Sequence, residues 1–364
     1  MFSFIDPADV TRLFCKCCSQ RPGVGKGNIL GVVQVDENGH TSVEAIQARL
    51  SGVQALRFTS QGEPSQDFDG VSRILSGLSQ LTSLGFRFSA PTAEAVACLT
   101  GLTRLRSLYL DSCQPLETLP DQMFALRELV SLDVWRCPNV QEIPERLSHA
   151  SALTSLSLYA CSALHYVSAG VVSLHRLRSL DLSWCEALQG LPPAIGDLEA
   201  LTELVLQGCR AVASLPSTIG GLAQLRILNL EVTTALERLP SEVTKLTSLE
   251  ELWLWTRSSV QHLPQGMRCL QQLRVLALGE AVTTDVVPTE LLHLPDACTL
   301  LFSGYAFQTM SNERRAALEA RRQRHGHPTS EDSLRISRAQ EAALPRALRS
   351  GGEALHAPYV VHEV

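Results

Sequence analysis

The sequence repeats itself every 24 residues over most of its length. Units open at a leucine at positions 81, 105, 129, 153, 177, 201, 225, 249 and 273, and the phase does not slip between residues 81 and 296. The unit from 201 reads LTELVLQGCRAVASLPSTIGGLAQ, with apolar residues at places 1, 4, 6, 12, 15, 19 and 22. A fixed period of this size is the signature of stacked repeats. The repeat therefore constrains the fold before any single residue is considered.

Each unit is predicted to begin with a strand and to end with a return leg. Places 4 and 6 are apolar and alternate with variable places 3, 5 and 7, as in a strand with one buried face. The later apolar places predict a turn and a short helical or extended segment. The proline at place 16 cannot donate a sheet hydrogen bond, so it is predicted to lie outside the sheet. One unit cannot bury its own leucines, whereas stacked units bury them against their neighbours in a curved solenoid.

Degenerate units flank the nine regular ones. VQALRF (53–58) lies 28 residues before Leu81, and ACTLLF (297–302) is in phase and predicts a final strand. The array is therefore predicted to contain about eleven strands. We divide the chain into a disordered leader (1–28), an N-terminal cap (29–52), the solenoid (53–302), a helical C-terminal cap (303–350) and a tail (351–364).

The repeat LxxLxLxxCxxLxxLPxxIgxL, as in LTELVLQGCRAVASLPSTIGGL, resembles known leucine-rich repeats. It is similar to the repeats of plant intracellular immune receptors and to the Leu-Pro repeats of type III effectors, which bacterial pathogens inject into host cells. The resemblance implies an α/β solenoid, a horseshoe with a parallel β-sheet on its concave face, a small α/β N-terminal cap and a helical C-terminal cap. The motif is specific for the fold but weak for function, because the fold serves many partners.

A cysteine occupies place 9 in five successive units, at Cys113, Cys137, Cys161, Cys185 and Cys209, and Thr233 follows in the next. Place 9 is expected to face inward at the bend after the strand. In-register side chains in a stack point the same way rather than at each other, so we predict small, reduced packing groups and not disulfides. Free thiols indicate a reducing compartment. The sequence also contains no Asn-x-Ser/Thr site and no predicted secretory leader.

Composition excludes several function classes. The net charge of −6 over 364 residues argues against generic nucleic-acid binding. No apolar run reaches the roughly 18 residues that a membrane span needs. No nucleophile–base pair, metal-ligand spacing or cofactor motif stands out, so we expect no cofactor and no catalytic or metal site.

The N-terminal 52 residues do not follow the repeat. GNILGVVQVDENGHTSVEAIQARL predicts a strand, a turn at Asn38–Gly39 and a helix from about Ser42 to Leu50, which together would cap the first coil. Upstream, Cys15, Cys17 and Cys18 are free thiols of a disordered leader, S-acylation sites or part of a metal site that lacks a fourth ligand. GVGKG lacks the glycine and the hydroxyl residue that a phosphate-binding loop requires.

The C-terminal segment predicts helices. Ser311 to Arg324 is rich in alanine and arginine, and the capping box Thr329 to Asp332 begins a second helix. A solvated capping role is favoured over a contact with nucleic acid or membrane, and His325 and His327 have no further ligands nearby. Some effectors resembling this chain carry ubiquitin-ligase domains with a catalytic Cys-x-Asp. Here Cys298 is followed by Thr-Leu, and no later cysteine exists.

Places 3, 5 and 7 are predicted to point into the concave side, with place 8 at its edge. All four tryptophans of the chain fall in this set, together with tyrosines and acids. Aromatic residues dominate binding hot spots, although cross-strand aromatic pairing alone is an alternative. We predict that this surface binds a protein or peptide of basic and apolar character. The candidate residues are Tyr109, Asp111, Asp133, Trp135, Arg136, Tyr159, Asp181, Trp184, Glu203, Glu231, Glu251, Trp253 and Trp255.

Three functions follow as hypotheses. The favoured one is a monomeric, non-enzymatic interaction module, an effector secreted into the host cytoplasm. An adaptor or receptor fragment of innate immunity is the second; such a receptor is expected to carry a nucleotide-binding module upstream, and only about 50 residues precede the array here. A ubiquitin ligase with an unrecognised C-terminal domain is the third. A cytoplasmic location is the alternative to delivery into a host cell.

Overall fold

The structure is a computed structural model that describes most of the repeat array. The described residues are 47, 48, 50, 52–59, 75–87, 99–114, 116–254, 260, 263–278, 294, 295 and 298–301. The sequence predictions for Cys15, Cys17 and Cys18, for Asn38–Gly39, for Trp255 and for the helices, capping box and histidines after residue 310 lie outside this set.

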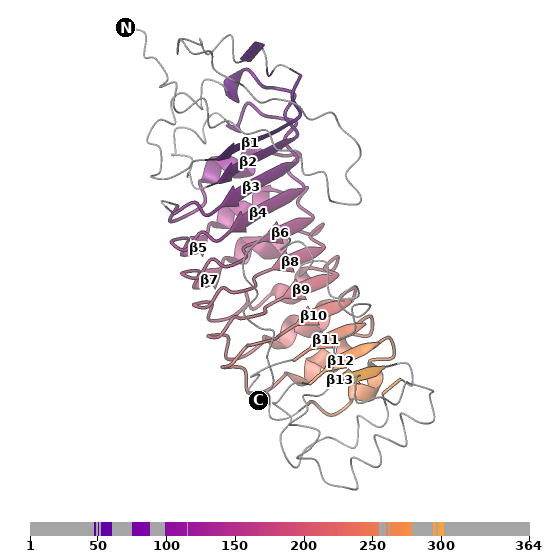
Figure 1. Cartoon of the computed structure of the whole chain (residues 1–364). Helices are drawn as coiled ribbons and strands as arrows, with labels where there is room; N and C mark the ends of the chain where they lie inside the picture. Colours follow the sequence, from indigo (N-terminus) through magenta and orange to yellow (C-terminus); the bar gives the residue numbers. More distant parts are fainter. Residues whose placement is uncertain are drawn as a thin grey trace, which may run out of the picture.

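A parallel sheet of eleven strands runs the length of the array (Figure 1). Its strands are β1 (Ala55–Thr59), β2 (Ser83–Arg87), β3 (Ser107–Asp111), β4 (Ser131–Trp135), β6 (Ser155–Ser157), β8 (Ser179–Asp181), β9 (Glu203–Val205), β10 (Ile227–Asn229), β11 (Glu251–Trp253), β12 (Val275–Ala277) and β13 (Thr299–Leu301). They are hydrogen-bonded in chain order. The predicted α/β solenoid with about eleven strands is confirmed.

The sheet keeps the register that the repeat predicts. Ser83 is aligned with Ser107, Ser107 with Ser131, and the same 24-residue step continues to Thr299. Between β1 and β2 the step is 28 residues, with Ala55 aligned with Ser83. Equivalent places of neighbouring coils therefore lie side by side, about 4.8 Å apart.

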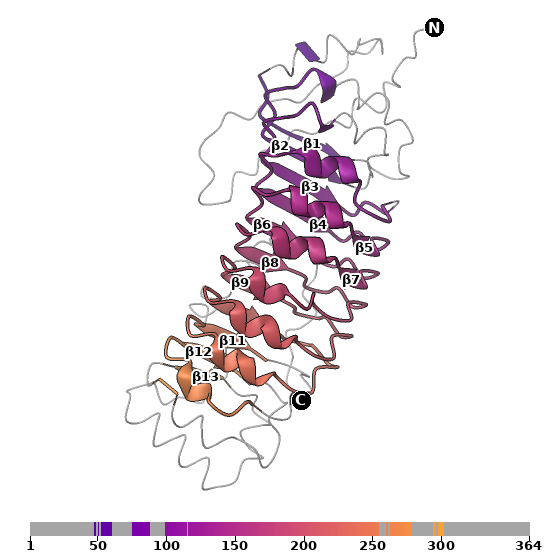
Figure 2. The same ribbon diagram turned by 180° about the vertical axis from the view of Figure 1, so that it is seen from behind.

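The return legs form a layer of short 3-10 helices behind the sheet (Figure 2). They are η1 (Asp121–Ala125), η2 (Glu145–His149), η3 (Ala169–Ser173), η4 (Ile195–Asp197), η5 (Ser217–Gly221), η6 (Ser241–Lys245) and η7 (Met267–Cys269). Pro120, Pro144, Pro216 and Pro240 immediately precede four of them in extended conformation, outside the sheet. The predicted position of the place-16 proline is confirmed.

Two features of this layer were not predicted. A second parallel sheet pairs β5 (Glu142–Ile143) with β7 (Tyr166–Val167) at the edge between the two layers. The 3-10 helices approach one another so closely that a Cβ atom on Gly196 would lie 2.0 Å from the carbonyl oxygen of Thr218. A glycine is therefore needed at this contact for steric reasons.

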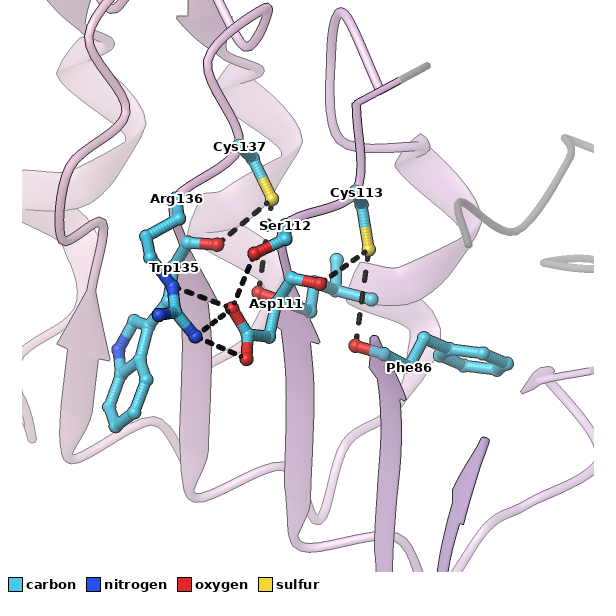
Figure 3. A network of polar contacts seen from close by, with 8 residues as sticks. Phe86, Asp111, Ser112, Cys113, Trp135, Arg136 and Cys137 are labelled. Carbon is cyan, nitrogen blue, oxygen red and sulfur yellow. Dashed lines mark hydrogen bonds and ion pairs between the residues drawn. The ribbon is translucent and has the colours of Figure 1, made fainter. Parts of the chain in front are cut away.

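The core is a continuous stack of leucines, and the five cysteines at place 9, here called the cysteine column, pack at its border. Leucines at places 1, 4 and 6 of the regular coils are buried, as predicted. The Sγ–H of each column cysteine donates to the place-6 carbonyl of the preceding coil, from 4.0 Å for Cys113 to Phe86 (Figure 3) to 3.0 Å for Cys209 to Leu182. Burial raises the pKa of the Cys161 and Cys209 thiols to about 12. Cys161 and Cys209 are therefore buried packing groups in their thiol form.

The residue before each column cysteine has an unusual backbone. Place 8 adopts left-handed φ values, from 53° at Arg136 to 61° at Trp184, and 76° at Gly208. Its N–H donates to the place-7 carbonyl of the next coil, for example from Ala160 to Ser183 at 2.7 Å. These hydrogen bonds offset the cost of about 1–2 kcal/mol that a left-handed residue other than glycine carries. The left-handed backbone at place 8 also changes the chain direction, so that the side chain at place 9 points inward.

The first coil is covered by residues that precede it. Gln47, Ala48 and Leu50 are helical, in agreement with the helix predicted from Ser42 to Leu50, and Leu50 is buried in the core cluster. The proposed domain boundaries otherwise stay predictions.

Candidate functional site

The outward face of the sheet is formed by places 3, 5 and 7, as β3 illustrates. Along Ser107–Asp111 the three outward residues are half-buried and the two leucines between them are fully buried. Tyr109 and Asp111 therefore lie on the outward face. None of the three described tryptophans, Trp135, Trp184 and Trp253, is buried in the core. Trp255 lies beyond the part of the chain that the structure describes.

Place 5 is much less exposed than its variability suggested. Asp133 is only 8 % exposed, and Ser157, Val205 and Asn229 at the same place are also buried. Each of these side chains is flanked by the place-5 side chains of two neighbouring strands, and this lateral contact excludes water. Asp133 accepts a hydrogen bond from Ser131 Oγ at 3.0 Å. We correct the expectation for Asp133, which belongs to the floor of the face and not to its open surface.

Trp135 and Tyr159 form an aromatic cluster above this floor. The indole Nε1–H of Trp135 donates to Ser157 Oγ at 3.0 Å, and Ser157 Oγ–H donates to Asp181 Oδ2 at 3.1 Å. The two rings are T-shaped, with centroids 6.4 Å apart, a favourable aromatic geometry. Tyr159 is 37 % exposed. The hydrogen bond fixes the indole, so the cluster presents a rigid aromatic surface.

Asp111 and Arg136 form an ion pair between adjacent coils (Figure 3). Arg136 Nε and Nη2 bind Asp111 Oδ1 at 2.9 and 2.7 Å, and Nη2 binds Oδ2 at 2.7 Å. Ser112 Oγ–H also donates to this carboxylate. The indole of Trp135 points away from the pair. The carboxylate of Asp111 is thus neutralised within the molecule, which the sequence did not reveal.

Trp184 occupies place 8 and lies against the next coil. A Cβ atom on Gly208 would lie 2.8 Å from two indole carbons of Trp184. Glycine at 208 therefore meets two requirements, a left-handed φ of 76° and space for the ring. Trp184 is half-buried at the edge of the face, as predicted for place 8.

The acidic residues of the face gather toward β9, β10 and β11. Glu203 accepts from Ser179 Oγ at 3.1 Å, and Glu251 accepts from Trp253 Nε1 at 2.9 Å. Glu231 is 9 % exposed, and burial raises its pKa to about 7, against the lowering effect of its hydrogen bond with Asn229. Burial also raises the pKa of Glu251. Glu231 was predicted as an open surface acid, and the structure shows it nearly closed by its neighbours.

The most exposed aromatic residue of the described chain is one that sequence reasoning missed. Tyr166 on β7 is 58 % exposed and its hydroxyl donates to Gln189 Oε1 at 2.6 Å. It lies at place 14, where other coils carry polar residues such as Thr118, Glu142 or Arg238. An aromatic residue at a place that is otherwise polar could have identified Tyr166 from the sequence.

Two classes of site receive no support from the described residues. No cluster of three or more potential metal-binding side chains occurs among them. Within the same residues, no helix has the length and apolar character that would let it traverse a bilayer.

The comparisons with known proteins agree with this architecture. Residues 145–293 match the family described as a leucine-rich repeat region. No curated protein matched the chain. The chain is a leucine-rich-repeat protein, and its repeats resemble those of a bacterial effector.

Two solved structures show the same fold, and a third is similar at a lower TM-score. The leucine-rich-repeat domain of the type III effector XopL is 25 % identical, with a TM-score of 0.51 over 72 % of this chain and 80 % of that one. A chain of the Toll–Spatzle complex of Drosophila is 20 % identical, with a TM-score of 0.50 over 73 % of this chain and 39 % of that one. A leucine-rich-repeat protein of Leptospira interrogans is 23 % identical, with a TM-score of 0.48 over 73 % of this chain and 76 % of that one.

Proposed function

We propose that the protein is a non-catalytic interaction module that binds a partner protein on the outward face of its sheet. The observation that carries the proposal is the aromatic cluster of Trp135 and Tyr159, held rigid by a hydrogen bond and left partly open. Rigid aromatic side chains supply much of the energy of protein interfaces at a small entropic cost. The repeat itself supports this reading, because solenoids use extended curved surfaces for binding.

A second aromatic side chain sets the size of the bound segment. Trp135 on β4 and Trp253 on β11 are separated by five strand steps in the sheet order, or about 24 Å. Between them the floor is made of short or buried side chains, including Ser157 and Asn229. An extended chain spans that distance with about seven residues. The partner is therefore a segment with two apolar anchors at about that spacing.

The charge of the face determines the chemistry of the partner. Arg136 is the one cation at the described outward places from β3 to β12, and it is already bound to Asp111. The acids of this face that are neither paired with an arginine nor assigned to its floor are Asp181, Glu203, Glu231 and Glu251. A partner with basic residues between its apolar anchors complements this surface.

The comparisons support a role as an effector. The structure of XopL is described as the leucine-rich-repeat domain of a type III effector, and its similarity extends over most of this chain. The Toll–Spatzle structure shows that the same fold takes part in a complex with a protein. We infer that this chain acts inside a host cell after delivery by a bacterium, with the repeat array as its binding surface.

Binding is tested by replacing Trp135, Tyr159 and Trp253 with alanine together. The wild-type protein, immobilised and incubated with host lysate, is expected to retain specific proteins that the triple variant loses. Tyr166→Ala is the matched control, because Tyr166 is exposed but lies outside this face. Circular dichroism establishes that the variants are folded. A folded triple variant that retains the same proteins as wild type contradicts the proposal.

Delivery and catalysis need separate experiments. A reporter fused to residues 1–50 is expected to enter host cells from a bacterium with a working type III system and not from a secretion-deficient strain. An autoubiquitination assay with purified host conjugating enzymes tests the ligase alternative, and ubiquitin chains formed by the wild-type protein would contradict a non-catalytic module.

A further inference from the structure

Two acids at the same place of different coils have opposite environments. Asp111 and Glu231 both occupy place 7, where the side chain leaves the outward face. Arg136 holds both oxygens of Asp111. The carboxyl of Glu231 contacts only neutral groups, since its Oε2 accepts from Gln207 Nε2 at 2.9 Å and from Asn229 Nδ2 at 3.4 Å. Among the described residues no cation forms an ion pair with Glu231.

The surroundings of Glu231 orient the carboxyl and leave part of it available. The amide of Asn229 comes from β10, and that of Gln207 comes from the segment directly after β9 in the preceding coil. The backbone N–H of Glu231 donates to Asn229 Oδ1 at 2.9 Å. These contacts fix Oε2 from one side. The second oxygen, Oε1, has no hydrogen-bond partner in the described part of the chain, and the residue as a whole is 9 % exposed.

The charged groups on the neighbouring strands cannot neutralise Glu231. Glu203 on β9 and Glu251 on β11 are acids themselves. Arg226, which precedes β10 in the same coil, binds Glu250 at 2.6 Å, and Arg274 approaches the same glutamate at 3.7 Å. The site therefore combines a fixed acceptor with a local excess of negative charge.

We propose that Glu231 forms a subsite for the side chain of a lysine or arginine from the bound protein, an inference that rests on the proposed use of this face. Trp253 completes the subsite. It is aligned with Asn229 in the sheet, and its Nε1–H is bound to Glu251, which fixes the ring. A long basic side chain places its aliphatic stem on an aromatic ring while its charged end reaches a carboxylate.

Occupation of this subsite has a chemical signature. Burial keeps the pKa of the Glu231 carboxyl near 7 in the free protein. A cation placed at Oε1 favours the ionised form, so the carboxyl releases its proton to solvent when the partner binds. The bond that forms is a hydrogen bond from the ammonium or guanidinium group to the carboxylate. At pH 7 we expect release of about half a proton per complex, since a group with a pKa near 7 is about half protonated.

The probe is an acetylated pentapeptide of alternating lysine and leucine, titrated into the full-length protein at pH 7. Calorimetry in two buffers with different ionisation enthalpies measures proton release. Glu231→Gln keeps the size of the side chain and is expected to bind at least about tenfold more weakly, with no proton release. Glu237→Gln is the matched control, because it removes the same charge at an exposed position away from this face, and is expected to behave as wild type.

Three results would overturn the subsite. They are equal affinity of Glu231→Gln and wild type, binding of the peptide without proton release, and no binding of the peptide to wild type. The proposed function has an independent readout, because the variant of Trp135, Tyr159 and Trp253 reports on retention of host proteins. If that variant loses its partners while Glu231→Gln behaves as wild type, the face binds protein and the subsite is wrong.

Discussion

The substitution Glu231→Gln is expected to change how stability depends on pH. Glu231 lies in a nearly closed site where only neutral amides bind its carboxyl. Glutamine keeps the side-chain oxygen that accepts those hydrogen bonds but carries no charge at any pH. The variant therefore isolates the cost of ionising this one carboxyl inside the folded protein.

The magnitude follows from the pKa of Glu231, which is raised from 4.5 to about 7 by burial. The folded protein holds this proton more tightly than the unfolded chain, so its contribution to stability is fully present below pH 4.5. That contribution is lost as the pH rises through 7. One pKa unit corresponds to about 1.4 kcal/mol, so the free energy of unfolding is expected to fall by about 3 kcal/mol across this range on account of Glu231. Glu231→Gln lacks this loss.

Urea denaturation at pH 5, 6, 7 and 8 measures the effect. The stability of Glu231→Gln relative to wild type is expected to increase with pH, by about 2.5 kcal/mol between pH 5 and pH 8. Other titrating groups, including Glu251, are shared by both proteins and cancel in the difference. Glu237→Gln is expected to follow the wild-type curve because Glu237 is exposed. If the free energies of unfolding of wild type and Glu231→Gln change with pH in the same way, ionisation of Glu231 does not destabilise the folded protein and the argument is refuted.

Three further predictions concern the repeat itself. Gly196→Ala is expected to lower the free energy of unfolding by about 1–3 kcal/mol, because the new Cβ atom would lie 2.0 Å from a carbonyl oxygen. Gly190→Ala is the control and is expected to be near neutral, because no atom lies within 4 Å of its Cβ position. Equal urea midpoints for the two variants would contradict this prediction. Ala160→Gly is expected to stabilise the protein by about 1 kcal/mol, since φ there is 58°, and a lower melting temperature would count against it. At pH 8 a thiol reagent is expected to label Cys269, because this cysteine is exposed. The reagent is expected to leave Cys185 unlabelled until urea is added, because burial raises the pKa of the Cys185 thiol. Mass spectrometry of the labelled peptides measures both, and labelling of Cys185 before urea is added would contradict the prediction.

The sequence determined the architecture because the repeat encodes it many times. Leucines at fixed places predict a buried strand face, and nine copies in phase predict parallel strands in a 24-residue register. The inward place of Cys185 and the position of Pro216 outside the sheet followed from the same period. Errors in one unit cannot shift the register, since every neighbour enforces it.

The candidate surface was predicted only in outline. The sequence identified the outward places, but it could not show that Asp133 is buried, that Trp135 is tied to Ser157, or that place 8 is left-handed. It also missed Tyr166, which lies at the edge between the layers. Whether these residues bind a partner remains a prediction for the experiments above.

The difference has one physical cause. Inward or outward orientation depends on alternation within a strand, which short stretches of sequence display. The pairing of outward side chains depends on contacts between coils that are 24 residues apart, and on which neighbour offers a donor, a charge or space. Asp111 is paired with an arginine of the next coil, whereas the carboxyl of Glu231 is hydrogen-bonded only by two neutral amides. The same place therefore holds a neutralised acid in one coil and an acid without a paired cation in another. Only the stacked structure makes that distinction.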